Sequence, residues 1–316
     1  MPALPSLFVS HGAPNLILHN VPARAFLAAY GKMLQRPKAI LMISAHFETD
    51  VAALSADEKP EMIYDFRGFE PELYQIEYPA PGDPALARKV SRLLASHGVA
   101  ANLLHDRGYD HGTWVPLKLL FPDAGIPVVQ LSVQPHRGPE HHFKLGQALT
   151  SLREEGVLII GSGSLTHNLS EFFKGRPAVD AEPFDWVVDF GEWVHDKAQQ
   201  GDVDSLLDYR AQAPHAEKNH PTEEHFLPFF VALGAAGEGA RTPRARKPFL
   251  RYPADGCLYL RLTHIHIYVF QLPLALRHAQ DRPTPLCGRS SLRGHHGRHS
   301  WLNAEGVQGV GAERSG

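Results

Sequence analysis

Five short segments of this 316-residue chain carry histidines, and histidine is both the commonest metal ligand and the usual acid or base near neutral pH. The segments are SHGAP (residues 10–14), SAHFET (44–49), DHGTW (110–114), GSLTHN (163–168) and HPTEEHFLP (220–228). Each lies where a buried strand or a helix is expected to begin or end. One such segment would mean little, but five of them indicate a single metal site that the fold assembles.

The strongest candidates for metal ligands are His11 and His46. Each follows an expected buried strand and adjoins a small residue, Gly12 or Ala45, that would admit an ion. Hydrogen bonding at a strand end explains either histidine alone equally well. The matching placement of the two favours metal binding.

The segment HPTEEHFLP offers a third candidate. Pro221 predicts a helix over residues 221–233, with His220 at the N-cap and His225 in the second turn, on different faces. His225 is expected to face inward, whereas His220 is expected to contact substrate or to lie behind the ligands. The alternative is that His225 is a packed core residue and that the two neighbouring glutamates only favour the helix dipole.

The two remaining segments suggest groups that handle protons or substrate. The turn GSGSLTHN lacks the lysine and spacing of a phosphate-binding loop, so His167 beside Asn168 is interpreted as a positioned acid or base. His111 follows Asp110, which could orient a histidine or serve a tight turn. A Ser-His-Asp hydrolase is disfavoured because residues 161–164 do not match the nucleophile elbow GxSxG.

Strands and helices alternate along the part of the chain that carries these histidines. Strands are expected over residues 4–10, 39–44, 51–54, 127–133 and 157–161, and helices over residues 21–34, 84–97, 114–121, 140–154, 184–199 and 203–209. This order predicts an α/β fold with a central, mostly parallel or mixed sheet flanked by helices. Ligand sites in such sheets lie beyond the carboxyl ends of the strands, so His11, His46 and His167 can converge at one edge.

The composition is that of an ordinary globular protein, with 43% hydrophobic and 21% charged residues. A net charge of −3 argues against nucleic acid or an anionic membrane as a partner. No apolar run approaches the roughly 20 residues of a membrane span, and the first residues lack the features of a signal peptide. Only two cysteines are present, so we expect no disulfide framework and a cytoplasmic location, with the oligomeric state left open.

In this order, the histidine segments resemble the class III extradiol ring-cleavage dioxygenases, in particular the DOPA 4,5-dioxygenase-like branch. The resemblance also rests on the stretch DFRGFEPELYQIEYPAPGDP at residues 65–84, and it covers about residues 4–235. It implies one divalent ion at the strand ends, Fe(II) for activity or Zn(II) as bound, and the opening of a catechol ring by O₂. It further implies that His11, His46 and His225 bind the metal, that His167 is the acid/base and that His111 contacts the substrate.

Two further residues, His220 and Asn168, are assigned to substrate binding. Iron sites of this chemistry usually combine two histidines with a carboxylate. The third ligand here is expected to be a histidine, which leaves Glu48 and Glu224 as the alternative carboxylates. Five aromatic residues between positions 64 and 78 could line the substrate site, although packing of their loop onto the domain is the favoured interpretation.

The sequence after Tyr252 departs from the family pattern. We therefore expect a catalytic domain over residues 1–252 and an atypical, partly disordered C-terminal extension over residues 253–316, whose last part has few large apolar side chains. A chain shortened after Tyr252 is expected to keep its metal. Two other functions remain open: a zinc-dependent hydrolase that uses the same histidines and a metal-bound water, and a non-catalytic binding protein.

Overall fold

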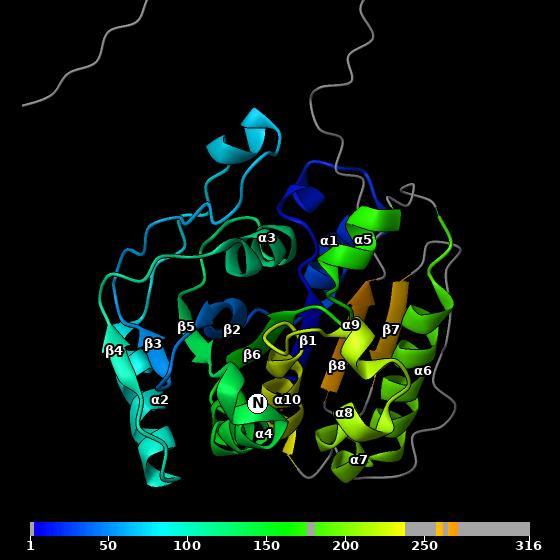
Figure 1. Ribbon diagram of the computed structural model, residues 1–316. Helices are drawn as coiled ribbons and strands as arrows, with labels where there is room; N and C mark the ends of the chain where they lie inside the picture. The colour runs from blue at the N-terminus through cyan, green and yellow to red at the C-terminus, as the bar shows by residue number, and fades with distance from the viewer. Residues whose placement is uncertain (1–2, 176–180, 238–256, 262–264, 271–316) are drawn as a thin grey trace, which may run out of the picture. The chain divides into compact units, whose positions relative to one another are not determined.

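The computed structural model describes residues 3–175, 181–237, 257–261 and 265–270 (Figure 1). These residues belong to one compact unit, Met1–Ala279, and contain an eight-stranded sheet in the order β4-β3-β5-β2-β6-β1-β8-β7. The strands are β1 (Ser6–Ser10), β2 (Ala39–Glu48), β3 (Ala53–Ser55), β4 (Asn102–Leu104), β5 (Val128–Val133), β6 (Val157–Gly163), β7 (Cys257–Arg261) and β8 (Ile265–Phe270). The neighbours from β5 to β8 are parallel, whereas β3 is antiparallel to β5 and β7 is antiparallel to β8.

Helices cover both faces of this sheet (Figure 1). They are α1 (Pro22–Met33), α2 (Pro84–Ser96), α3 (His111–Leu120), α4 (Gly138–Ala148), α5 (Leu169–Gly175), α6 (Asp185–Gln200), α7 (Val203–Leu207), α8 (Tyr209–Gln212), α9 (Ala216–Asn219) and α10 (Leu227–Ala235). Short 3-10 helices are η1 (Pro14–Ile17), η2 (Pro71–Gln75), η3 (Pro135–Arg137) and η4 (Thr150–Arg153). Within the described ranges, no helix has the length and apolar character needed to cross a membrane.

Two hydrophobic cores form because side chains alternate across each strand. In β1, Leu7 and Val9 point into the core under α1 and α3, whereas Phe8 points into the core under α2, α4 and α10. Both faces of the central strands are buried, as the unbroken apolar runs in the sequence predicted. The predicted α/β class, with a mixed sheet between two helical layers, is confirmed.

The strand and helix boundaries differ from the predictions in several places. β2 continues to Glu48, so His46 lies inside the strand rather than after it, although the pairing of β2 with β6 stops at Ser44. α3 begins at His111, three residues before the start predicted at residue 114. The short strand β4 was not predicted, because its three residues carry no periodic signal.

The helix predicted over residues 221–233 is wrong in its first six residues. Residues 221–226 form bends and turns, and α10 begins only at Leu227. The Glu223 side chain accepts hydrogen bonds from Tyr209 and Arg210, while its carbonyl accepts the N–H groups of Phe226 and Leu227. These contacts hold a turn where the proline alone predicted a helix start. His220 is therefore not an N-cap, and His225 precedes α10.

The domain boundary expected after Tyr252 lies outside the described residues and stays a prediction. β7 and β8 nevertheless fall within the expected extension. β8 pairs in parallel with β1, and β7 pairs with β8. Part of the expected extension thus contributes to the sheet.

Candidate metal centre

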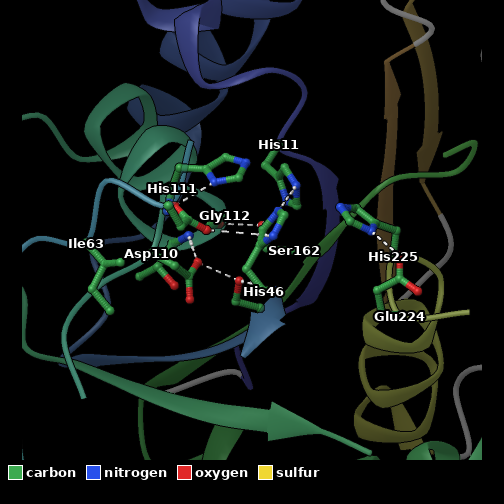
Figure 2. Close-up of polar contacts among 12 residues, drawn as sticks. His11, His46, Ile63, Asp110, His111, Gly112, Ser162, Glu224 and His225 are labelled. Atoms are coloured by element: carbon green, nitrogen blue, oxygen red, sulfur yellow. Dashed lines mark hydrogen bonds and ion pairs between the residues drawn. The ribbon is translucent and has the colours of Figure 1, made fainter. Parts of the chain in front are cut away.

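His11 and His46 face each other at the carboxyl edge of the sheet (Figure 2). The His11 N–H donates to the carbonyl of Gly163, which ends β6, and His46 comes from the far part of β2. The two Nε2 atoms lie 3.0 Å apart. Nitrogens that each bind one zinc ion at about 2.0–2.1 Å are about 3.0–3.4 Å from each other, so this pair fits a shared ion.

Two more imidazole rings surround this pair, one on each side (Figure 2). The ring centre of His225 lies 5.3 Å from that of His11 and 4.9 Å from that of His46. The ring centre of His111 lies 5.3 Å and 4.0 Å from the same two rings. The predicted ligands and the predicted substrate contact are thus brought together.

Two groups of residues in this cluster could each hold an ion. His11, His46 and His111 form one, and His167, Glu224 and His225 form the other, with the ligand atoms of each group within 4.8 Å of one another. The predicted ligand set of His11, His46 and His225 draws on both groups. The choice between His111 and His225 as third ligand stays a prediction.

Asp65 is a site residue that the sequence reading missed. Its Oδ1 accepts hydrogen bonds from His111 Nδ1 at 2.8 Å and from the His111 backbone N–H at 3.1 Å, and its Oδ2 lies 3.7 Å from His46 Nδ1. One carboxylate thus lies behind two rings of the cluster. Asp65 lies at the start of the loop before η2, where no periodic pattern indicates a functional residue. The only indication in the sequence was that Asp65 belongs to the DFRGFE stretch on which the family resemblance partly rests.

Glu224 has the same relation to the other pair of rings. Its Oε1 lies 2.9 Å from His225 Nδ1 and 3.6 Å from His167 Nδ1, and the two rings stack with centres 3.4 Å apart and planes 11° apart. A carboxylate accepts hydrogen bonds, so the His225 proton lies on Nδ1 and its Nε2 is free for a metal. Glu224 therefore lies on the outer edge of the ring that was predicted to bind the metal.

Burial keeps the central imidazoles neutral. Burial and the neighbouring histidines lower the pKa of His11 and of His225 well below the usual value. Burial, followed by the charge of His111, lowers the pKa of His46 to about 3, although Asp65 opposes this. Burial raises the pKa of Asp65, but hydrogen bonds and charge from His111 outweigh it and bring the pKa to about 2. Neutral imidazoles beside the ionised Asp65 carboxylate are suited to a divalent cation.

His220 and Asn168, predicted to bind substrate, have other contacts here. His220 is fully buried, its Nε2 donates to the Leu165 carbonyl at 2.8 Å, and its ring stacks on Phe226. Asn168 accepts the Glu171 N–H at 3.0 Å and donates to the Lys218 carbonyl, so it caps α5. Substrate binding by either residue stays a prediction to which these contacts add no support.

Asp110 does not orient a histidine among the described contacts; it is the N-cap of α3. Its Oδ1 accepts from the Thr113 N–H at 3.0 Å and from Ser44 Oγ at 2.6 Å, and its Oδ2 pairs with Arg107 at 2.6 Å. Of the two roles considered for Asp110, orienting a histidine or serving a tight turn, the described contacts show the local one. Glu48, one of the two alternative carboxylate ligands, is exposed at the end of β2.

The aromatic side chains of the 64–78 loop form a cluster beside His111. Phe66 meets the His111 ring edge-on at 5.8 Å and packs against Phe69, Tyr74 and Trp114. Tyr78 instead lies in the core, where its hydroxyl donates to the Phe121 carbonyl. The cluster thus packs the loop onto α3, as favoured, and also places Phe66 next to the predicted substrate contact.

Comparison with known proteins agrees with this geometry. Residues 24–253 match the family described as the catalytic LigB subunit of aromatic ring-opening dioxygenase. The chain is 44% identical over 240 residues to 4,5-DOPA dioxygenase extradiol of Beta vulgaris, which covers 75% of this chain and 88% of that protein. It is 39% identical over 236 residues to 4,5-DOPA dioxygenase extradiol of Escherichia coli K12, which covers 73% of this chain and 85% of that protein.

The fold is also similar to a solved structure. The crystal structure of an uncharacterised protein from Escherichia coli K12 superimposes on this chain with a TM-score of 0.61 at 34% sequence identity. The superposition covers 73% of this chain and 88% of the other protein's chain. The resemblance noted in the sequence is therefore confirmed. This chain belongs to the family of aromatic ring-opening dioxygenases, in the DOPA 4,5-dioxygenase-like branch of the class III extradiol enzymes.

Proposed function

We propose that this extradiol dioxygenase opens the ring of a catechol with O₂ and uses one divalent ion held by His11, His46 and His225, with Fe(II) as the active ion and Zn(II) as an alternative occupant. The observation that carries the proposal is the 3.0 Å approach of the His11 and His46 Nε2 atoms, with the rings of His111 and His225 on either side of the pair. When bound, the ion would supply open positions for the two catechol oxygens and for O₂.

His111 and His167 are proposed to handle the substrate. The His111 Nδ1 proton is directed to Asp65, so its Nε2 can accept a hydrogen bond from a catechol hydroxyl. His167, stacked on His225, would take a hydroxyl proton from the catechol and return it to an oxygen of the product as the ring opens. Phe66, beside His111, offers an edge against which an aromatic substrate can pack.

The overall reaction needs no external reductant. The ring bond beside one hydroxyl-bearing carbon breaks, and both oxygen atoms of O₂ enter the product, one in a new carbonyl group and one in a new carboxylate. The proposed partners are therefore a small aromatic substrate and O₂. The net charge of −3 and the two cysteines support the proposal that neither nucleic acid nor membrane is a partner and that the location is cytoplasmic.

The test is to load the metal-free protein with Fe(II) without oxygen, add a panel of catechols, and then follow O₂ uptake and the yellow ring-opened product. The variant His167→Ala should lower turnover by about 10²–10⁴-fold while the metal content persists. His97→Ala, the same change at an exposed histidine at the end of α2, is the matched control. Ester or amide cleavage with zinc and no O₂ uptake would instead indicate a hydrolase, and absence of any turnover would indicate a binding protein.

A further inference from the structure

α3 contains a proline, and it lies one turn after the site histidine His111. Pro116 has no N–H, so the carbonyl of Gly112, four residues earlier, lacks its helical hydrogen-bond partner. A buried carbonyl without a donor is costly, so another group is expected to serve it.

Ser162 of β6 provides that donor. Its Oγ lies 2.5 Å from the Gly112 carbonyl oxygen and 3.0 Å from His11 Nδ1, and its side chain is fully buried (Figure 2). A carbonyl oxygen can only accept, so the single hydroxyl hydrogen of Ser162 is directed to Gly112. Towards His11, Ser162 Oγ can therefore act only as an acceptor.

This direction determines the tautomer of His11. The hydrogen bond to Ser162 requires a proton on Nδ1, and a neutral imidazole with its proton on Nδ1 has a free electron pair on Nε2. His11 Nε2 is the atom that lies 3.0 Å from His46 Nε2. Only an unprotonated nitrogen can bind a metal ion, and a hydrogen bond at the other nitrogen also fixes the plane of the ring.

We propose that Ser162, oriented by the carbonyl that Pro116 leaves without a helical partner, is a positioning residue that holds His11 in the tautomer and orientation needed for metal binding. The inference rests on the proposed function only in taking His11 as a ligand. It joins two segments of the sequence that the chemistry itself does not use, the GSGS turn and the proline of DHGTWVP.

The first test compares Ser162→Ala with two matched variants. Ser162→Thr keeps the hydroxyl, and Ser164→Ala removes a hydroxyl two residues away that donates to the Thr166 carbonyl. Zinc or cobalt affinity is measured by competition with a chelator, and the histidine tautomers of the metal-free protein are read from ¹⁵N NMR. We expect Ser162→Ala to weaken metal binding by about 10–100-fold and to lower the population of the Nδ1–H form of His11, with Ser162→Thr close to wild type. Ser164→Ala should change neither quantity.

The second test acts from the other end of the hydrogen-bond chain. Pro116→Ala supplies an N–H to the Gly112 carbonyl, so this carbonyl no longer needs the Ser162 hydroxyl, which can then also turn to donate to His11 Nδ1. The population of the Nδ1–H form of His11 should then fall, and metal affinity with it, although no polar side chain has been removed. This variant tests the inference even if Ser162→Ala does not fold.

The outcomes separate this inference from the proposed function. A wild-type ¹⁵N spectrum with the His11 proton on Nε2, or a Ser162→Ala protein with unchanged tautomer and metal affinity, would overturn the role of Ser162. Failure to cleave any catechol would instead count against the proposed function. The tautomer measurement needs neither metal nor substrate, so it decides the inference in either case.

Discussion

Each of five site histidines has an oxygen atom near its Nδ1, and for His11 this atom is Ser162 Oγ. Asp65 lies behind His111 and His46, and Glu224 lies behind His225 and His167. In the proposed three-histidine ligand set, no carboxylate binds the metal directly. Asp65 and Glu224 would instead hydrogen-bond to the outer nitrogens of the rings and supply negative charge in that way. At the residue scale, the site depends on these outer oxygens as well as on the ligands.

Replacement of Glu224 tests this dependence. Glu224→Ala removes the acceptor of His225 Nδ1 and should weaken metal binding by about 10–100-fold, whereas Glu224→Gln keeps an acceptor oxygen and should lose less. Metal affinity by chelator competition is the measurement. Glu217→Gln, an exposed change of the same kind, is the control. If Glu224→Gln and Glu224→Ala both lost metal affinity to the same large extent, Glu224 would itself be a ligand.

At the scale of elements, the site depends on how closely the turn before α10 approaches β6. Gly163 faces this turn without a side chain, and a β-carbon there would overlap the carbonyl oxygen of His225; Gly161 lies in the same way against the Pro228 carbonyl at the start of α10. The Ser164 N–H donates to the same carbonyl at 2.8 Å. The backbone of β6 therefore sets the position of His225 directly.

Gly163→Ala should push His225 away from β6. We expect a loss of about 1–3 kcal/mol in the free energy of unfolding, measured with urea, together with weaker metal binding. Gly191→Ala in α6 is the matched control, because its β-carbon would meet only a flexible leucine methyl group at 3.3 Å and alanine favours a helix. Equal stability and metal affinity in the two variants would contradict the proposed close approach.

Sequence patterns predicted those strands and helices whose position depends on residues close together in the chain. Buried strands appear as apolar runs, and the helix expected from residue 84 does begin at Pro84, where the Asp83 side chain accepts the Leu86 N–H. The start of α10 was not predictable in this way, since long-range contacts to Glu223 decide it. Asp65 was missed for a related reason: only the fold brings it to His111, 46 residues away.

At the scale of the whole molecule, several histidines are buried in neutral form. Burial lowers the pKa of His142 and of His220 to about 3, and it lowers the pKa of His11 and of His225 well below the usual value. His142 shows why: its Nδ1 donates to the Gly138 carbonyl and its Nε2 accepts the Gln134 N–H, so a second proton has no place. The unfolded chain, in contrast, protonates its histidines below about pH 6.5.

Stability of the metal-free protein should therefore fall in mild acid. A group whose folded pKa lies below its unfolded pKa contributes fully above about pH 6.5 and progressively less as the pH falls toward the folded value. Each such histidine adds a slope of up to about 1.4 kcal/mol per pH unit between these limits. Urea unfolding from pH 7.5 to pH 5 measures how the free energy of unfolding changes with pH. His142→Gln removes one of the contributing histidines, so the slope should fall by the contribution of one proton, up to about 1.4 kcal/mol per pH unit. A constant free energy of unfolding over this range would contradict the prediction.

The C-terminal part of the chain gives a second prediction at this scale. A chain that ends at Tyr252 lacks β7 and β8, which leaves β1 as an unpaired edge that favours self-association. We expect lower stability and more aggregation by light scattering, but an unchanged metal content, because the proposed ligands precede residue 252. A chain that ends at Ala279 keeps both strands and should match the full chain. Loss of metal from the shorter chain alone would show that β8 supports the site.

The hydrogen bonds of the metal centre join residues that are far apart in the chain. His11 contacts His46 across 35 positions and Ser162 across 151. Such contacts form late in folding, because closing long loops costs entropy before it gains contacts. During synthesis the proposed ligand set cannot form until His225 has left the ribosome. Capture of cobalt during refolding, seen by its absorbance, should therefore coincide with the slowest phase and report completion of the native sheet.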